Sequence, residues 1–281
     1  MILIADGGST KVDWIALDNN KQELFRTRTE GLNPAILAKE KIFDRISQNL
    51  ELTRYKEKVT KLFFYGAGCS TSILAKKLED EFVKMFPNAK IRVKEDMLGA
   101  VYAASAGKES IVCILGTGSN STYFDGKIAH ENAPSLGYTL MDEASGNFFG
   151  KRLLVDYFYK KMPRNIAQDF EKSYNLDPDE IKRNLYVEDS PNAYLGHFAE
   201  FMFKFKEEEY IHHIIQEGFS LFFERQILPY KKPASVPIYF IGSIAFYFKP
   251  FLEEVANQNG LKIAGILQRP IHDLIKYHQE L

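Results

Sequence analysis

An apolar strand that runs directly into a glycine-rich turn occurs twice in this chain. Ile2–Ala5 leads into D-G-G-S-T-K at residues 6–11, and Ile111–Leu115 leads into G-T-G-S at residues 116–119. A supersecondary unit that recurs within one chain indicates duplication. We therefore expect two α/β halves that each open on a strand, a glycine-rich turn and a second strand, with a ligand-binding cleft between the halves.

The first half continues with alternating strand and helix patterns. Val12–Leu17 and Glu23–Thr29 are expected to complete an antiparallel meander, because turn residues separate these strand-like runs. Beyond the meander, apolar residues recur at helical spacing in some segments and form short continuous runs in others. The predicted order is helix 35–50, strand 59–65, helix 70–86, strand 91–93 and helix 97–106.

The second half repeats the opening motif and then becomes largely helical. Its next strands, Ser121–Phe124 and Lys127–His130, are predicted to be joined by the hairpin signal Asp125-Gly126. One more buried strand is expected at Val236–Ile241, followed by helices to the C-terminus. The helices predicted before that strand cover residues 151–161, 166–173, 178–185, 192–205 and 210–228.

Length and composition fit two folded domains. A chain of 281 residues can form two medium domains, each with its own core. We expect a first domain at 1–108 and a second at 109–281, the second carrying the helical additions. The content of 45% hydrophobic and 26% charged residues is typical of an ordinary globular protein, so the chain is expected to fold throughout.

Charge and cysteine content exclude several classes of partner. Lys and Arg number 36 against 37 Asp and Glu, so no positive field is available for nucleic acid or for an anionic membrane. No apolar run is long enough to span a membrane, and the opening M-I-L-I-A-D lacks the features of a signal peptide. The two cysteines are far apart in sequence and cannot form a disulfide framework. We therefore expect a cytoplasmic protein with a small-molecule partner.

The first glycine-rich turn has the residue types of an anion site. Glycines let backbone N–H groups approach an anion, hydroxyls add donors, and a lysine adds positive charge. An aspartate beside such a site would face Mg²⁺, most readily through water. The other interpretation is a plain hairpin turn, because short glycine motifs are common by chance. The residues concerned are Asp6, Gly7, Gly8, Ser9, Thr10 and Lys11.

The second turn strengthens the interpretation of the first. Thr117, Gly118 and Ser119 also follow a buried strand directly. Two hydroxyl-bearing glycine turns in equivalent positions could hold a polyphosphate from both sides. Neither turn has the spacing of a P-loop or of a dinucleotide-binding fingerprint, so those two classes are disfavoured.

Asp96, in K-E-D-M-L-G-A, stands between a predicted strand and a predicted helix. A carboxylate at that point can accept the proton of a substrate hydroxyl that attacks a γ-phosphate. The alternative is that Asp96 caps the helix, which on position alone is the better interpretation. Glu95 beside it is expected to be an exposed charge.

Two further segments combine polar residues with glycine turns. In residues 135–150, Asp142 and Glu143 could accept hydrogen bonds from sugar hydroxyls, or the stretch could be a capped helix start with Ser145 as N-cap. In residues 240–245, the strand-to-helix turn F-I-G-S-I-A could pack a flat base or a ribose. Its alternative is a routine loop between a strand and a helix.

Taken in order, five motifs resemble those of the N-acetylglucosamine kinase group. That group belongs, with the BadF/BadG/BcrA/BcrD-type ATPases, to the actin-like superfamily. The resemblance implies a duplicated ribonuclease H-like (actin-like ATPase) fold of the α/β class, with ATP in a cleft between two domains and Mg²⁺ as cofactor. The motifs, which span residues 6–245, are D-G-G-S-T-K, E-D-M-L-G-A, L-G-T-G-S, D-E-A-S-G and F-I-G-S-I-A.

The resemblance also implies a role for each matching residue. Asp96 would be the catalytic base, and Asp6 would face the metal. The ATP-binding residues would be Gly7, Gly8, Ser9, Thr10, Lys11, Thr117, Gly118, Ser119, Gly242 and Ser243. The sugar-binding residues would be Asn33, Asp96, Thr117, Leu136, Asp142 and Gly146.

The chain departs from the family pattern W-G-x-x-x-G-D-E-G-S at three positions. Leu136 replaces the tryptophan, Met141 the first glycine and Ala144 the second. Leu136 removes an aromatic wall from the expected sugar pocket, so the sequence leaves the choice of sugar open.

The sequence thus predicts a kinase that transfers the γ-phosphoryl group of ATP to a sugar or amino-sugar hydroxyl, with an N-acetylglucosamine-like acceptor favoured. Two alternatives are a partner-coupled ATPase of the BadF type and a catalytically silent sugar sensor. Retention of Asp6, Lys11 and Asp96 argues against the sensor, which needs no base. In the aromatic-rich helical half, the spacing of Phe198, Phe201 and Phe205 is more typical of an internal core than of an interface, and a homodimer stays an open alternative.

Overall fold

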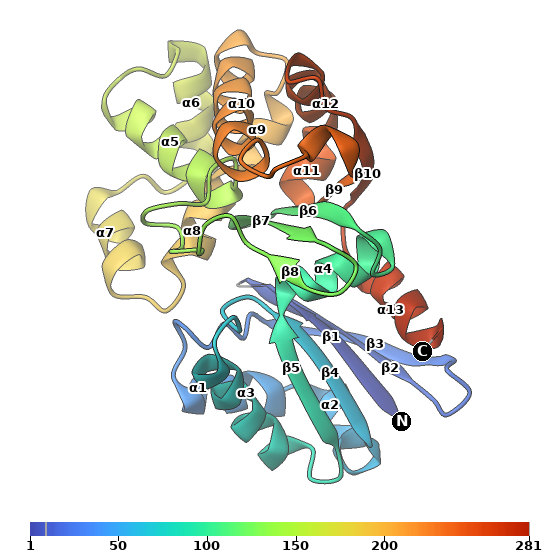
Figure 1. Ribbon diagram of the computed structural model, residues 1–281. Coiled ribbons are helices and arrows are strands. Elements are labelled where there is room, and N and C mark those ends of the chain that lie inside the picture. The colour runs from blue at the N-terminus through green and yellow to red at the C-terminus, as the bar shows by residue number, and fades with distance from the viewer. Residues whose placement is uncertain (9, 281) are drawn as a thin grey trace. The chain divides into compact units, whose positions relative to one another are not determined.

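The computed structural model describes residues 1–8 and 10–280, which form two compact units (Figure 1). Unit 1 comprises Met1–Gly107 and Pro270–Leu281, and unit 2 comprises Lys108–Arg269. The first boundary agrees within a residue with the expected one. The C-terminal segment, which the sequence analysis assigned to the second domain, folds with unit 1 instead.

Unit 1 is built on a five-stranded sheet with the strand order β3-β2-β1-β4-β5. β1 pairs antiparallel with β2 and parallel with β4, and β4 pairs parallel with β5. The antiparallel meander predicted from the turn signals is confirmed. The strands are β1 (Ile2–Gly7), β2 (Lys11–Leu17), β3 (Glu23–Glu30), β4 (Lys61–Gly66) and β5 (Lys90–Glu95).

Helices cover both faces of this sheet, because alternate residues of its strands are apolar on both sides. One face buries Trp14 and Phe64 in a cluster that also includes residues of α1 (Lys39–Ser47), α2 (Leu50–Tyr55) and α3 (Ser72–Met85). The other face buries Ile4 and Ile15 against the C-terminal helix. Two helices lie together on this second face, α4 (Asp96–Ser105) and α13 (Ile271–Glu280).

Unit 2 repeats the topology of unit 1. Its strand order is β10-β9-β6-β7-β8, with β6 antiparallel to β7 and parallel to β9. β6 therefore corresponds to β1, and the predicted duplication of an α/β unit is confirmed. The strands are β6 (Ser110–Leu115), β7 (Ser119–Phe124), β8 (Ala129–His130), β9 (Ile238–Ile241) and β10 (Ile263–Leu267).

The helices of unit 2 bury a large aromatic core between themselves and the sheet. Phe149, Phe219 and Phe248 are among its fully buried rings. The helices are α5 (Gly146–Phe158), α6 (Arg164–Ser173), α7 (Pro178–Tyr186), α8 (Pro191–Phe198), α9 (Glu200–Lys204), α10 (Glu209–Phe222), α11 (Ser243–Tyr247) and α12 (Lys249–Gln258). A π-helical turn, Phe223–Ile227, extends α10.

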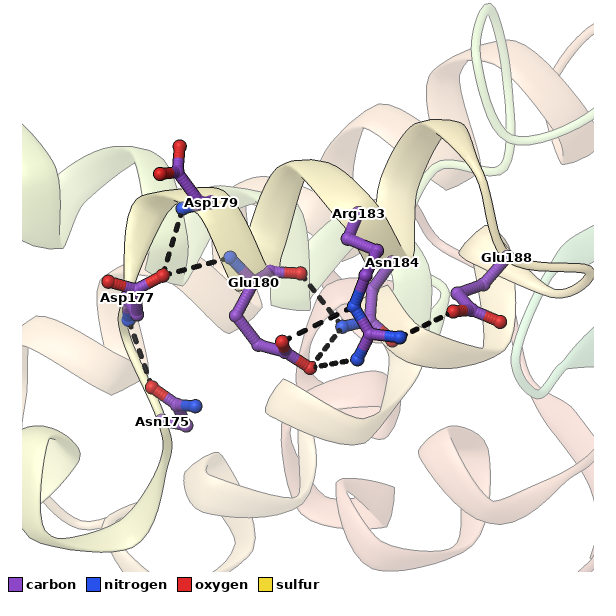
Figure 2. A network of polar contacts seen from close by, with 7 residues as sticks. All are labelled: Asn175, Asp177, Asp179, Glu180, Arg183, Asn184 and Glu188. Atoms are coloured by element: carbon purple, nitrogen blue, oxygen red, sulfur yellow. Dashed lines mark hydrogen bonds and ion pairs between the residues drawn. The ribbon is translucent and has the colours of Figure 1, made fainter.

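Helix α7 shows why a cluster of charges need not be a functional site. Asp177 caps its N-terminus by accepting from the amides of Asp179 and Glu180, and Arg183 then pairs with Glu180 and Glu188 (Figure 2). These contacts are exposed and mostly three residues apart, so they stabilise the helix locally.

The sequence predictions were wrong in several details. β10 was expected to be helical, but the segment pairs with β9 as a parallel strand with a register shift. The predicted helix 192–205 is divided into α8 and α9, and the predicted helix 35–50 is shorter, with α2 following it. Among the described residues, no helix is long and apolar enough to cross a membrane.

Candidate functional site

The first glycine-rich turn is a tight connection between β1 and β2. The Gly8 amide donates to the Lys11 carbonyl at 2.9 Å, and the Gly31 amide donates to the Thr10 carbonyl at 2.9 Å. Gly8 and Thr10 are exposed, so the tip of the turn faces outward. Ser9, which the sequence analysis included in this loop, lies outside the described residues.

Asp6 is the penultimate residue of β1, close to this turn, and lies directly opposite Asp13 of β2. Burial, followed by the charges of Asp13 and Asp96, raises the pKa of Asp6 from its ordinary value to about 7, while Lys11 acts in the opposite direction. Asp13 in turn pairs with Arg28 of β3 at 2.7 Å. A positive charge near Asp6 would therefore be stabilised by several carboxylates of this region.

Asp96 begins α4, and Glu95 occupies the N-cap position. The expectation that Asp96 itself is the N-cap is therefore wrong by one residue. Its Oδ1 accepts from the adjacent Met97 amide at 3.0 Å. α4 can approach β4 closely because Gly99 has no side chain, and a Cβ there would meet Tyr65 at 2.7 Å. This packing fixes the start of the helix, and with it Asp96, relative to the sheet.

Asn33 lies in the loop after β3, where its Oδ1 accepts from the Ala35 amide at 2.9 Å. The side chain occupies the space that a Cβ of Gly68 would need. Gly68 has φ +75°, a conformation that favours glycine. The loop is held further by Lys77 of α3, whose ammonium donates to the carbonyls of Pro34 and Leu37.

The second glycine-rich turn connects β6 and β7, at the position equivalent to the first. The Gly116 amide donates to the Gly118 carbonyl at 3.0 Å. The start of α5 closes over the turn, because the Gly146 amide donates to the Gly116 carbonyl at 2.8 Å and the Asn147 amide to the Thr117 carbonyl at 2.9 Å. Thr117, Gly118, Ser119 and Gly146 are thus brought together within unit 2.

Asp142 lies against this turn. A Cβ on Gly118 would be 2.8 Å from its Oδ2, which also accepts from Asn147 Nδ2 at 2.8 Å. Burial raises the pKa of Asp142, the Asn147 side chain and the Ser119 amide lower it, and the charge of Glu143 raises it. Asp142 is therefore a buried carboxylate at the edge of the second turn.

Three further residues of the 135–150 stretch, Ser145, Leu136 and Ala144, were also singled out from the sequence. Ser145 is the N-cap of α5, as expected, because its side chain accepts from the Phe148 amide. Leu136 is 58% exposed, and its amide donates to Met141 Sδ at 3.4 Å. Ala144 replaces the family glycine but still has φ +56°.

Gly242 connects β9 to α11 and has φ +122°. A Cβ there would collide with the Leu115 carbonyl and would lie 3.0 Å from the Gly116 amide, so Gly242 packs against the start of the second turn. Ser243 follows it and is exposed. The structure thus brings the turn at 242–243 together with the turn at 116–119.

Three features of this arrangement were not predicted from the sequence. Asp13 was not singled out, although the hairpin register that places it opposite Asp6 follows from the predicted strands. Asn147, which donates to Asp142, lies in the 135–150 stretch but was given no role. Glu143 was named, yet its ion pair with Arg225 joins residues 82 apart in sequence and had no local signal.

The described residues offer limited protein ligands for a metal ion. No group of three or more His, Cys, Asp or Glu among residues 1–8 and 10–280 has the geometry of a metal site. A Mg²⁺ ion commonly takes one or two carboxylates and completes its shell with water and substrate phosphates. Asp6 fits such a role, because burial and then the charges of Asp13 and Asp96 disfavour its anion, which a cation would offset.

The chain is similar over its whole length to proteins of known structure. The structure of a candidate N-acetylglucosamine kinase from Porphyromonas gingivalis is 35% identical, with a TM-score of 0.91, covering 100% of this chain and 99% of that one. A second candidate N-acetylglucosamine kinase, from Chromobacterium violaceum, has a TM-score of 0.72 at 13% identity, with 98% of each chain covered.

More distant structures share the fold. A glucokinase of the ROK family from Streptomyces griseus, solved with glucose and AMPPNP, has a TM-score of 0.54 at 14% identity and covers 98% of this chain and 97% of that one. A search of curated protein sequences gives no match. The sequence model of the BadF/BadG/BcrA/BcrD ATPase family matches residues 5–154, which is more than half of the chain. The chain therefore belongs to the BadF/BadG/BcrA/BcrD ATPase family.

Proposed function

We propose that this protein is an ATP-dependent kinase that phosphorylates a hydroxyl of a sugar or amino sugar, with an N-acetylglucosamine-like acceptor. The observation that carries the proposal is the duplicated turn. Each unit presents a glycine-rich turn between its first two antiparallel strands, and a carboxylate lies beside each turn, Asp6 in unit 1 and Asp142 in unit 2.

Both turns are proposed to bind the phosphates of ATP. The exposed tip at Gly8 and Thr10 offers backbone and hydroxyl donors, and Lys11 adds a positive charge. The second turn offers Thr117, Gly118 and Ser119, and the neighbouring turn at 242–243 would take the adenosine. Membership of an ATPase family supports the choice of nucleotide.

Mg²⁺ is proposed as the cofactor, held by Asp6 through water. When bound, the ion would neutralise charge on the phosphate oxygens of ATP. A cation is compatible with this position because burial and two further carboxylates destabilise the Asp6 anion. The positive charge of Lys11, which lowers the pKa of Asp6, would also offset negative charge at this site.

Asp96 is proposed as the general base. As the sugar oxygen attacks the γ-phosphorus, the carboxylate accepts the hydroxyl proton, the new O–P bond forms and the bond to the β-phosphate oxygen breaks, releasing ADP. The place of Asp96 at the start of α4 gives it a fixed position on the sheet. Positioning and charge stabilisation supply most of the rate in such reactions.

The acceptor is proposed to contact Asn33, Thr117, Asp142 and Gly146. An amide and a carboxylate can together donate to and accept from sugar hydroxyls. An amino-sugar acceptor is favoured because a relative 35% identical over the full chain is named as a candidate N-acetylglucosamine kinase. Leu136 in place of the family tryptophan predicts weaker stacking on the sugar ring.

A reductase-activating ATPase that carries an iron–sulfur cluster is disfavoured. Such clusters are held by several cysteine thiolates. Cys69 and Cys113 are both buried, one in each unit, and burial raises the pKa of Cys69 to about 12. These thiols are therefore protonated core residues.

The test is ADP release with Mg²⁺-ATP across a panel of N-acetylated amino sugars, anhydro sugars and neutral hexoses. We expect turnover with one acceptor class and little turnover without acceptor. Asp96→Asn should abolish turnover while the variant still binds ATP. Glu95→Gln, which changes the adjacent carboxylate at the same junction, is the matched control and should retain activity.

Turnover that is independent of the sugar would contradict the kinase and favour a partner-coupled ATPase. ATP binding without turnover on any acceptor would favour a silent sensor. Equal losses in the two variants would assign the effect to the junction between β5 and α4 rather than to proton transfer.

A further inference from the structure

Glu143 is a buried carboxylate that is only partly satisfied. Glu143 is only 5% exposed, and its Oε1 accepts a hydrogen bond from Arg225 Nη1 at 2.7 Å. Oε2 is also buried but has no hydrogen-bond partner among the described residues. Burial of a carboxylate is costly unless a positive charge compensates it. The conformation of Glu143 therefore depends strongly on Arg225.

Arg225 reaches Glu143 from an unusual backbone segment. It lies in the π-helical turn Phe223–Ile227, which follows directly after α10 and departs from regular α-helical geometry. Such turns are rare and occur frequently at functional sites. Arg225 is 54% exposed, so the compensating charge is held at the surface while the carboxylate is inside.

Strand β7 brings the two partners together. Ser119 Oγ donates to the Glu143 carbonyl at 2.7 Å, and Ser121 Oγ donates to the Gln226 carbonyl at 2.7 Å. Residues two apart in a strand point to the same face, so one strand face braces both the Glu143 segment and the π-helical turn. The ion pair is thus tied directly to the second glycine-rich turn, where Ser119 begins β7.

The residues on either side of Glu143 have strained backbones. Asp142 has φ +72° and Ala144 has φ +56°, which is uncommon for residues with a Cβ. Such conformations persist only where surrounding contacts hold them. Within this three-residue turn, the buried side chain of Glu143 is anchored by a charged partner outside the segment.

We propose that the Glu143–Arg225 ion pair is a positioning pair that holds the Asp142 turn in its sugar-binding conformation. This inference rests on the proposed function, because it assigns the pair a role through Asp142. Arg225 contacts neither sugar nor ATP in this proposal. Its effect reaches the sugar through the placement of one carboxylate and therefore bears on sugar affinity rather than on phosphoryl transfer.

The test compares Arg225→Met with Arg152→Met. Arg152 also pairs with a buried carboxylate of unit 2, Asp156, with an Nε–Oδ2 distance of 2.9 Å. Both variants leave a buried anion without its cation, so both should lower thermal stability. Only Arg225→Met is expected to raise KM for the sugar, by about tenfold or more, with KM for ATP changed by less than about twofold.

A conservative variant keeps the proposal testable if Arg225→Met folds poorly. Arg225→Lys retains the positive charge and is expected to recover most of the sugar KM. Equal sugar KM values in Arg225→Met and Arg152→Met would overturn the positioning role. A fall in kcat without a change in sugar KM would overturn it as well.

The wild-type panel separates this inference from the proposed function. If wild type phosphorylates no sugar, the kinase assignment itself fails. If the wild-type protein phosphorylates a sugar and both arginine variants have the same sugar KM as the wild type, the kinase assignment stands and the positioning pair is rejected.

Discussion

The ring of Phe64 lies where Gly7 would carry a side chain. A Cβ on Gly7 would be 2.5 Å from Phe64 Cζ, and the ring is only 1% exposed, so it has little room to move. We expect Gly7→Ala to lower the free energy of unfolding by about 1–3 kcal/mol through overpacking. Urea unfolding monitored by circular dichroism measures the change.

Gly8→Ala is the matched control for this substitution. Its Cβ would meet only the Lys11 carbonyl, at 3.4 Å, so stability should change little. Phe64→Leu should offset part of the Gly7→Ala loss, because a smaller side chain relieves the collision. Additive losses in the double variant would show that Phe64 is not the cause.

Gly118 stands in a similar relation to Asp142. A Cβ there would be 2.8 Å from Asp142 Oδ2, and the carboxylate would have to move away from the second turn. If Asp142 binds the sugar, Gly118→Ala should raise the sugar KM by about tenfold or more. Steady-state kinetics test this. Gly116→Ala, whose Cβ would find its nearest neighbour at 4.0 Å, should leave the sugar KM close to wild type.

The duplication could be predicted because each half repeats one local signal. A strand followed by a glycine-rich turn is visible in the sequence, and pairing between neighbouring strands follows from it. The same reasoning failed at β10, which is an edge strand without fully buried residues. Gly265 in its centre lies against the ring of Tyr239, a long-range contact that leaves no pattern in the local sequence.

The candidate site could be predicted where its residues lie at the ends of strands. Asp6, Asp96 and Thr117 each lie close to the end of a predicted strand and were singled out from that position. The supports around them are tertiary contacts between distant segments. Glu143 contacts Arg225, which lies in a π-helical turn that departs from the 3.6-residue period on which helix predictions depend.

Lys77 holds the loop that carries Asn33. Its ammonium donates to the carbonyls of Pro34 and Leu37, one of them at 2.8 Å. Lys77→Met keeps the aliphatic stem but removes both donors, and we expect a loss of about 1–3 kcal/mol in stability. If Asn33 binds the sugar, its KM should rise in parallel. Thermal unfolding and steady-state kinetics measure the two effects.

Lys76→Met provides the comparison for Lys77. Lys76 is the preceding residue of α3 and pairs on the surface with Asp80 at 3.0 Å. Exposed pairs of this kind contribute little, so stability and sugar KM should stay near wild type. A matching loss in both variants would trace the effect to α3 as a whole and not to the 33–37 loop.

His278 should make stability depend on pH below neutrality. Its Nε2 lies 3.0 Å from the Tyr65 hydroxyl, and burial lowers the pKa of His278 from 6.5 to about 4. As pH falls, the unfolded chain therefore protonates His278 before the folded protein does. The stabilisation that comes from burying the neutral imidazole is present in full above pH 6.5 and is lost as pH falls toward 4, by roughly 3 kcal/mol. Urea unfolding at stepped pH should show a shallower decline in His278→Leu. His272→Gln, an exposed histidine on the same helix, should keep the wild-type decline, and equal declines in all three proteins would contradict the assignment.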